Sequence, residues 1–162
     1  MPTIEETLKS ATEILQKSGI AEPRREAGSL LAFALGKDRT FLITQNRTEI
    51  DATDEAVFKS LLARRAEREP FQYITGKQEF YGLDFRVSPA VLIPRPETEM
   101  IVENAIAAIE SLKNPRFCEV GVGSGCISIA ILANAPSSSA IGLEISSAAI
   151  KIAQDNAEFH GV

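Results

Sequence analysis

Three glycines at every second position, Gly121, Gly123 and Gly125, separate an apolar segment at residues 117–120 from a stretch with helical spacing. Glycine adopts backbone conformations that other residues resist, so this spacing predicts a tight turn that joins a strand to a helix. The turn would present free N–H groups at the start of the helix, where anions such as carboxylates bind. The pattern predicts an α/β unit with a candidate ligand site. A plain glycine turn that binds nothing is the structural alternative.

The elements around this turn alternate between strand and helix. Apolar periodicity predicts strands at residues 116–120 and 140–144 and helices at residues 97–113, 125–133 and 146–160. This order predicts a parallel sheet of the doubly wound class. Two strands and two helices do not cover both faces of such a sheet, and the second strand has an open edge. We therefore expect the domain to continue beyond Val162.

The first half of the chain is helical instead. Short loops join three predicted helices, at residues 4–18, 23–36 and 53–65, which predicts a small helical bundle. The charged run at residues 64–69 mixes signs, which favours a solvated helix face over a basic patch. After Pro70, aromatic and β-branched residues alternate, which predicts a β-hairpin with strands at residues 71–74 and 78–87. The predicted parts are a bundle at residues 1–70, a β-hairpin with a proline-rich linker at residues 71–95, and an α/β domain at residues 96–162.

Composition argues against several classes of function. The chain has 17 Lys and Arg against 22 Asp and Glu, a net charge of −5, so we expect neither nucleic acid nor an anionic membrane as a direct partner. It has no long apolar segment and no secretory signal, so we expect a cytoplasmic protein. One histidine, His160, and two cysteines, Cys118 and Cys126, predict no metal site.

The residues beside the glycines distinguish two classes of cofactor. A dinucleotide site has the pattern Gly-x-Gly-x-x-Gly or -Ala, but Cys126 stands at its last position here and the third glycine, Gly125, falls one residue earlier. Glu119 precedes the first glycine by two residues, and it is no part of that fingerprint. An acid followed by Gly-x-Gly-x-Gly is typical of S-adenosylmethionine sites, where the carboxylate faces the methionine ammonium. The pattern favours S-adenosylmethionine over a nicotinamide dinucleotide.

A second acid follows the next predicted strand. Glu144 comes directly after the apolar strand and lies 19 residues after Gly125. A carboxylate at the end of the neighbouring parallel strand is placed to accept both hydroxyls of an adenosine ribose. A helix cap or a solvent-exposed acid is the structural alternative, and both classes of cofactor contain this ribose.

The string Pro-Arg-Pro-Glu-Thr-Glu at residues 94–99 is a further candidate site. Glu97 or Thr98 is placed to cap the helix that follows, and the prolines stiffen the segment. Arg95 stands between two prolines and is suited to hold a carboxylate or a nearby loop. These three residues are candidate substrate-side residues, with a rigid linker and a capped helix as the alternative.

The chain resembles the release-factor glutamine methyltransferases of the PrmC/HemK type through nearly its whole length. The resemblance is most specific at residues 73–75 and 78–85, at residues 92–99 and at residues 119–125. It implies a substrate-recognising helical bundle, a connecting β-hairpin and a Rossmann-like methyltransferase domain. The implied reaction transfers a methyl group from S-adenosylmethionine to the glutamine of the Gly-Gly-Gln motif in class I peptide chain release factors.

The resemblance also implies roles for individual residues. By motif position, the cofactor-binding residues are Glu119, Gly121, Val122, Gly123, Ser124, Gly125 and Glu144, and threonine is usual in the family where Val122 stands. The family's Asn-Pro-Pro-Tyr motif, which holds the target amide, would lie beyond Val162. We therefore predict no catalytic residue within the chain and no activity from residues 1–162 alone.

Three other functions remain as alternatives. A non-catalytic protein-binding module would use the bundle for recognition and keep the α/β part as a remnant nucleotide-binding unit. A nicotinamide-dependent oxidoreductase is disfavoured by Glu119 and Cys126. An adenine methyltransferase shares the same core, but the negative net charge argues against nucleic acid.

Overall fold

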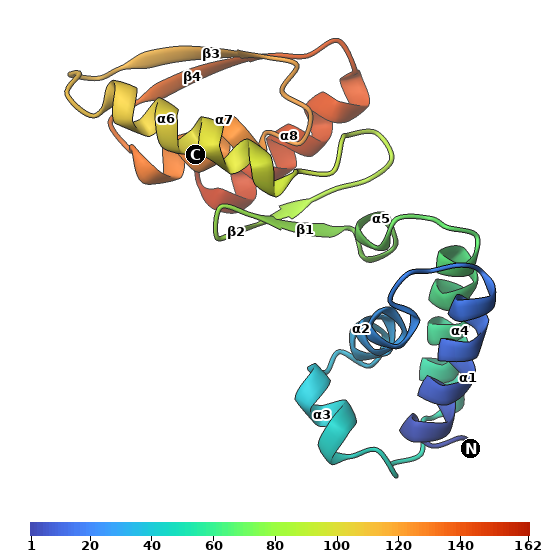
Figure 1. Ribbon diagram of the computed structural model, residues 1–162. Helices are drawn as coiled ribbons and strands as arrows, with labels where there is room; N and C mark the ends of the chain where they lie inside the picture. The colour runs from blue at the N-terminus through green and yellow to red at the C-terminus, as the bar shows by residue number, and fades with distance from the viewer. The chain divides into compact units, whose positions relative to one another are not determined.

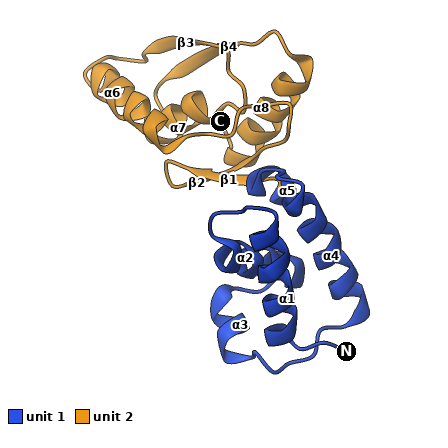
Figure 2. Cartoon of the chain, turned by 45° about the vertical axis from the view of Figure 1, so that its right-hand side comes forward, with its two compact units in different colours: residues 1–75 blue, residues 76–162 orange.

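Two separate hydrophobic cores divide the chain. The computed structural model describes residues 1–162, which fold into unit 1, residues 1–75, and unit 2, residues 76–162 (Figure 2). Unit 1 is entirely helical, whereas unit 2 combines a hairpin, two parallel strands and three α-helices. No helix in either unit is long and apolar enough to cross a membrane.

Unit 1 is a bundle whose helices share one core (Figure 1): α1 (Ile4–Lys17), α2 (Pro23–Leu35), α3 (Arg39–Thr44), α4 (Ala52–Ala66) and α5 (Phe71–Thr75). Side chains that accept hydrogen bonds from free N–H groups cap the starts of α1, α3 and α4. Thr3 forms a capping box with Glu6, and Asp51 caps α4. Gly36 ends α2 with a φ of +60°, the left-handed conformation that glycine adopts without strain. The three helices predicted in this region are confirmed.

The segment after Pro70 is a helix, so the prediction of a strand at residues 71–74 is wrong. The Pro70 carbonyl accepts hydrogen bonds from the N–H groups of Tyr73 and Ile74 at 3.0 and 3.1 Å, which closes the turn of α5. Ile74 is buried in the bundle core. Packing of this side chain therefore outweighs the β propensity of the neighbouring aromatic residues.

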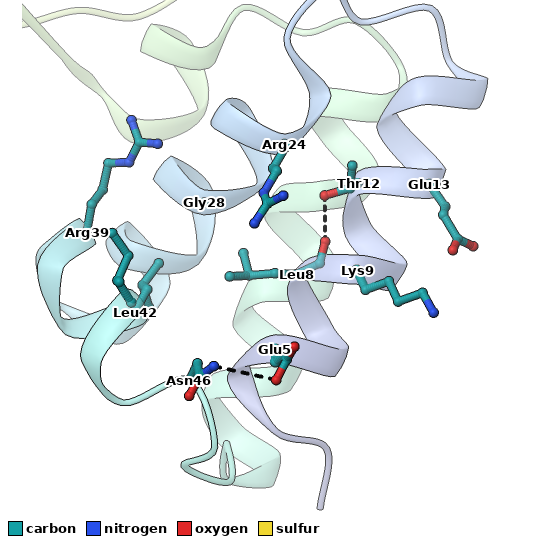
Figure 3. A pocket seen from close by; sticks show the side chains of 11 residues that line it. Glu5, Leu8, Lys9, Thr12, Glu13, Arg24, Gly28, Arg39, Leu42 and Asn46 are labelled. Atoms are coloured by element: carbon teal, nitrogen blue, oxygen red, sulfur yellow. Dashed lines mark hydrogen bonds between the residues drawn. The ribbon is translucent and has the colours of Figure 1, made fainter.

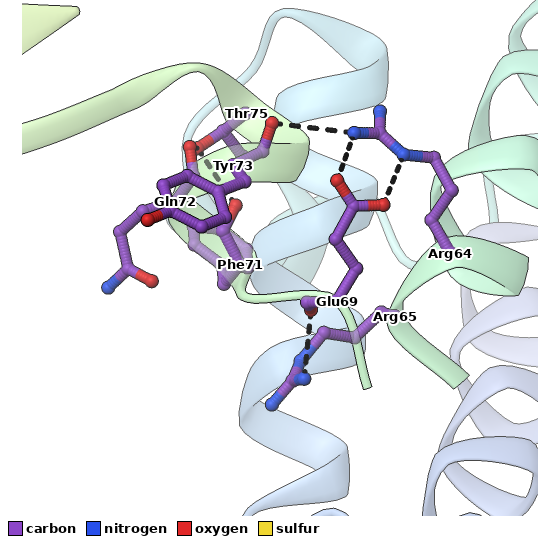
Figure 4. A network of polar contacts seen from close by, with 7 residues as sticks. All are labelled: Arg64, Arg65, Glu69, Phe71, Gln72, Tyr73 and Thr75. Carbon is purple, nitrogen blue, oxygen red and sulfur yellow. Dashed lines mark hydrogen bonds and ion pairs between the residues drawn. The ribbon is translucent and has the colours of Figure 1, made fainter. Parts of the chain in front are cut away.

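The charged run at residues 64–69 is partly used for internal pairing rather than being only a solvated face. Arg64 binds the Glu69 carboxylate through Nε at 2.7 Å and Nη2 at 2.5 Å, and Nη2 also donates to the Tyr73 carbonyl at 3.4 Å (Figure 4). Arg65 pairs with Glu26 of α2. These contacts attach the end of α4 to α5 and to α2.

Unit 2 begins with a β-hairpin, in which β1 (Lys77–Phe80) pairs antiparallel with β2 (Leu83–Arg86). The turn residues Tyr81 and Gly82 both have positive φ, +54° and +74°, as a two-residue type I′ turn requires. Phe80 and Phe85 are buried and pack edge to face, with ring centroids 6.1 Å apart. A hairpin is present as predicted, but its strands lie at residues 77–80 and 83–86, almost wholly within the predicted second strand, and its turn lies at residues 81–82.

The predicted strand–turn–helix pattern forms a βαβα unit: β3 (Arg116–Val120), α7 (Cys126–Asn134), β4 (Ser139–Leu143) and α8 (Ser147–His160). β3 and β4 are parallel, with Val120 opposite Leu143 at their carboxyl ends. Figure 1 shows these two helices and α6 (Glu99–Ile109) on the same side of the sheet. On the other face, Val120 is 80% exposed and Leu143 is 52% exposed. The predicted α/β class, a helical bundle followed by a hairpin and a partial Rossmann-like unit, is confirmed.

Candidate functional site

The glycine turn connects β3 to α7 at the carboxyl end of the parallel strands. Gly121, Gly123 and Gly125 have φ values of +79°, +55° and +80°, which other residues rarely adopt. The Leu143 carbonyl at the end of β4 accepts hydrogen bonds from the Gly121 N–H at 2.7 Å and the Val122 N–H at 3.3 Å. These bonds hold the turn against the neighbouring strand.

The glycines of this region differ in their surroundings. A Cβ atom at Gly121 or Gly123 would meet no atom within 4 Å, so open space adjoins both positions. A Cβ atom at Gly125 would come within 2.8 Å of Ile129 Cδ1, and one at Gly142 of β4 would come within 2.7 Å of Val122 Cγ2. Gly125 and Gly142 therefore permit close packing, while Gly121 and Gly123 leave room for a ligand. Sequence reasoning missed Gly142, whose signal is a glycine inside a strand.

Glu144 meets the turn because the ends of β3 and β4 are adjacent. Its Oε2 accepts a hydrogen bond from the Gly123 N–H at 3.0 Å, and its Oε1 accepts from the Ile145 and Ser146 N–H groups at 2.9 and 3.0 Å. Hydrogen bonds from the backbone of Ser146 first, and of Gly123 next, hold the pKa of Glu144 below its usual value. A charged carboxylate is thus fixed beside the middle glycine.

Glu119 lies on the face of β3 that is turned toward α7. Its Oε2 accepts hydrogen bonds from the Ser128 N–H at 3.0 Å and from the Ser128 hydroxyl. Burial raises the pKa of Glu119, and the two hydrogen bonds from Ser128 oppose that rise. Both bonds use the same oxygen, so Oε1 is left to accept from a cation or a water molecule.

Ser124 and Cys126 flank the last glycine of the turn, and both are buried. Burial raises the pKa of the Cys126 thiol, which keeps it protonated at neutral pH and unsuited to nucleophilic chemistry. The Ser124 carbonyl accepts a hydrogen bond from Asn156 Nδ2 at 2.8 Å, whereas the Ser124 N–H forms none within the chain. Sequence reasoning missed Asn156, a polar residue in an otherwise ordinary helix.

The Pro-Arg-Pro-Glu-Thr-Glu segment leads into α6 through a short 3-10 helix, η1 (Pro96–Thr98). The side chains of Arg95 and Glu97 are exposed and form no hydrogen bond or ion pair within the chain, while the Arg95 carbonyl accepts a hydrogen bond from the Thr98 N–H at 2.9 Å. The predicted capping by Glu97 or Thr98 is wrong, because η1 continues into α6 and Thr98 is already helical. Instead, Glu99 Oε1 accepts a hydrogen bond from the Tyr81 N–H at 3.0 Å, which joins the start of α6 to the hairpin turn.

Each unit contains a cavity. In unit 2, a cavity of about 340 Å³ lies between α7, β4 and α8, and the glycine turn and Glu144 border it. In unit 1, a cavity of about 570 Å³ lies between α1, α2 and α3 (Figure 3). Leu8 and Leu42 are among its apolar lining residues, and Arg24 and Arg39 among its charged ones. No group of three or more His, Cys, Asp or Glu side chains is arranged to hold a metal ion.

Both units of the chain resemble proteins of one family. Residues 6–76 match the PrmC N-terminal domain. The chain is 43% identical over 159 residues to a release factor glutamine methyltransferase of Geobacter sulfurreducens, with 98% of this chain and 55% of that protein aligned. The chain is similar to the release factor glutamine methyltransferases. The resemblance inferred from the sequence is therefore confirmed.

Other release factor glutamine methyltransferases match over a similar extent. The Koribacter versatilis protein is 42% identical over 155 residues, which cover 96% of this chain and 55% of that protein. The Vibrio cholerae protein is 39% identical, with 96% of this chain and 54% of that protein covered. The chain thus spans about half the length of the curated relatives it matches.

Proposed function

We propose that these residues are the N-terminal part of an S-adenosylmethionine-dependent enzyme that methylates the glutamine of the Gly-Gly-Gln motif in class I peptide chain release factors. The relatives are named release factor glutamine methyltransferases, and both units are aligned with them. The observation that carries the proposal is the pair of acids at the glycine turn. Glu144 binds the Gly123 N–H, and Glu119 keeps one free carboxylate oxygen. A transferase of this kind acts on a translation factor, so we place it in the cytoplasm.

The turn fits the methionine part and the ribose of S-adenosylmethionine. Open space at Gly121 and Gly123 admits a ligand close to the backbone. Glu119 Oε1 is matched to the methionine ammonium, directly or through water, and the unbonded Ser124 N–H near the start of α7 is a donor for the methionine carboxylate. The oxygens of Glu144 keep lone pairs with which they accept the ribose hydroxyls. We assign Val122 and Gly125 to the same site through their places in the turn.

The proposed reaction depends on alignment more than on a strong base. S-adenosylmethionine supplies an electrophilic methyl group bound to a sulfonium. The amide nitrogen of glutamine is a poor nucleophile because its lone pair is delocalised into the carbonyl, so it must be held in line in a dry pocket. The Asn-Pro-Pro-Tyr motif implied for that task does not occur within residues 1–162. We therefore assign cofactor binding to these residues and no catalytic group.

We assign substrate recognition to the bundle at residues 1–70, to the exposed residues Arg95 and Glu97, and to the half-buried Thr98. The cavity of about 570 Å³ in the bundle offers apolar contacts beside charged side chains, a combination typical of protein interfaces. Ile43 at this cavity is 76% exposed and available to a partner. A non-catalytic protein-binding module would use the same surface, but it would have no need for the two acids at the glycine turn.

The test uses the full-length protein. Calorimetric titration should show binding of S-adenosylmethionine and none of NAD. With methyl-labelled S-adenosylmethionine, a release factor should become labelled, and one whose Gly-Gly-Gln glutamine is replaced by alanine should not. Binding of NAD would instead support an oxidoreductase. Capture of the release factor without cofactor binding or methyl transfer would establish the protein-binding module and overturn the proposal.

A further inference from the structure

Asn156 is the most deeply buried polar side chain in the chain, with 0% of its surface exposed. Its Oδ1 accepts a hydrogen bond from the Arg86 N–H at 2.8 Å, and its Nδ2 donates to the Arg86 carbonyl at 3.0 Å and to the Ser124 carbonyl at 2.8 Å. One side chain of α8 therefore joins β2 to the glycine turn. Asparagine is suited to this position because its amide carries two donors beside an acceptor.

The bond to Ser124 acts on the part of the turn with the greatest backbone freedom. Ser124 stands between Gly123 and Gly125, both in left-handed conformations. The peptide unit between Ser124 and Gly125 is held on both sides, because its carbonyl accepts from Asn156 and its N–H donates to the Val122 carbonyl at 2.8 Å. Glu144 holds the preceding part of the turn through the Gly123 N–H. The free Ser124 N–H lies between these two fixed points.

We propose that Asn156 is a positioning residue that preorganises the glycine turn for S-adenosylmethionine, an inference that rests on the proposed function. Glycine-rich segments lose more backbone entropy on ordering than other segments do. A turn that is already ordered before the ligand arrives binds more tightly, because ordering costs less of the binding free energy. Asn156 acts through the Ser124 carbonyl and makes no contact with the cofactor.

His160 provides a matched control on the same helix. Its Nε2 lies 2.8 Å from the Asp84 carbonyl, and its ring centroid is 5.1 Å from that of Phe85. His160 thus joins α8 to the hairpin as Asn156 does, but it makes no hydrogen bond to the glycine turn. The substitution His160→Phe keeps an aromatic ring there and removes the hydrogen bond on the hairpin side alone.

The experiment compares Asn156→Asp and His160→Phe in the full-length protein. Asn156→Asp keeps the acceptor for the Arg86 N–H but loses both donors. We expect it to raise the Kd and KM for S-adenosylmethionine by about tenfold, with kcat at saturation within about threefold of wild type, because preorganisation acts on binding. His160→Phe should lower the Tm while the Kd stays within about twofold. Equal Kd values for folded Asn156→Asp and wild type would overturn the inference. A wild-type protein that does not bind the cofactor would overturn the proposed function instead.

A second measurement needs no variant that might fail to fold. In the NMR spectrum of the wild-type protein, saturation with S-adenosylmethionine should shift the side-chain amide signals of Asn156. Those of Asn134 should not move, because that side chain donates to the Ala130 carbonyl within α7 at 2.9 Å. Asn156 signals that stay in place on saturation would contradict a role in positioning the turn.

Discussion

Units 1 and 2 bury their apolar side chains by different means. In unit 1, the helices close around a core in which Leu30 and Leu31 are 0% exposed. In unit 2, Phe85 and Val102 are equally buried among the helices, the hairpin and one face of the sheet, but Val120 on the other face is 80% exposed. Amphipathic helices complete a core among themselves, whereas a parallel sheet requires a packed layer on each face.

The two units also use left-handed glycines for different purposes. Gly36 of unit 1 has a φ of +60°, and its N–H donates to carbonyls of α2, so it terminates a helix. Gly123 of unit 2 has a φ of +55°, and its N–H donates to the Glu144 carboxylate. Neither glycine has an atom within 4 Å of the position of a Cβ. The same conformation serves chain termination in one unit and the candidate ligand site in the other.

The largest effect should come from testing whether residues 1–162 are sufficient for activity. Residues 1–162 should transfer no methyl group to a release factor, while the full-length protein does, because these residues lack an amide-holding motif and one face of the sheet is bare. In hydrogen exchange on the same chain, amides of the bundle should be protected at least about tenfold more than those of β3 and β4. Full transferase activity from residues 1–162 would overturn the assignment, and equal protection would remove the contrast between the units.

Gly123→Val should abolish cofactor binding while leaving the circular dichroism spectrum close to wild type. A β-branched side chain at a φ of +55° is strained, and its Cβ would enter the open space assigned to the ligand. The loss in affinity should exceed about a hundredfold by calorimetry, because both effects act at the binding surface.

The matched control for this variant is Gly36→Val in unit 1, which has the same backbone conformation and the same open surroundings. It should lower the stability of the bundle by about 1–2 kcal/mol and leave cofactor affinity unchanged. If Gly36→Val lowered the affinity for S-adenosylmethionine as much as Gly123→Val does, the two units would not be functionally distinct.

Glu144→Ala should weaken S-adenosylmethionine binding by about tenfold or more, since the variant loses the charge-assisted hydrogen bonds proposed to the ribose hydroxyls. The control is Glu103→Ala, at an exposed position, which should leave the affinity for S-adenosylmethionine unchanged.

The same variant, Glu144→Ala, should change how stability depends on pH. The folded protein holds the pKa of Glu144 below its usual value, so its hydrogen bonds stabilise the turn at neutral pH. That contribution is lost as the pH falls through the lowered pKa. The free energy of unfolding should therefore fall less steeply with decreasing pH in the variant than in the wild type. Curves of equal slope for the two proteins would contradict the role of Glu144 in holding the turn.

The smallest effect is expected in the bundle, from Glu26→Gln. The side chains of Arg65 and Glu26 are 15% and 23% exposed, and Arg65 Nη2 donates to Glu26 Oε1 at 3.0 Å. Loss of this pair should cost about 1 kcal/mol of unfolding free energy and leave cofactor affinity unchanged. The control is Glu22→Gln, whose exposed pair with Arg25 should contribute less than about 0.5 kcal/mol. Urea unfolding measures the free energy of unfolding of both variants. Equal losses of this free energy would show that burial does not strengthen the Glu26–Arg65 pair.

Much of the candidate site could be predicted because its signals are local. Glycines at alternate positions after an apolar strand indicate a turn with left-handed residues, and Gly121, Gly123 and Gly125 adopt that conformation. The position of Glu144 at the end of the next strand predicted its place near the turn, and it binds the Gly123 N–H. The error at residues 71–74 arose where a local β pattern competed with burial of Ile74 in a helical core.

The sequence by itself determined the three longest helices of unit 1, the order of strand and helix in residues 116–160 of unit 2, and the location of the glycine turn, because apolar periodicity and glycine spacing act between near neighbours. Only the tertiary structure decided which distant groups meet the turn. Asn156 lies 32 residues from Ser124 and 70 from Arg86, and Gly142 lets Val122 pack closely against β4. Such contacts depend on how α8 and β4 pack. No local sequence pattern indicates which distant backbone groups a buried side-chain amide will bind.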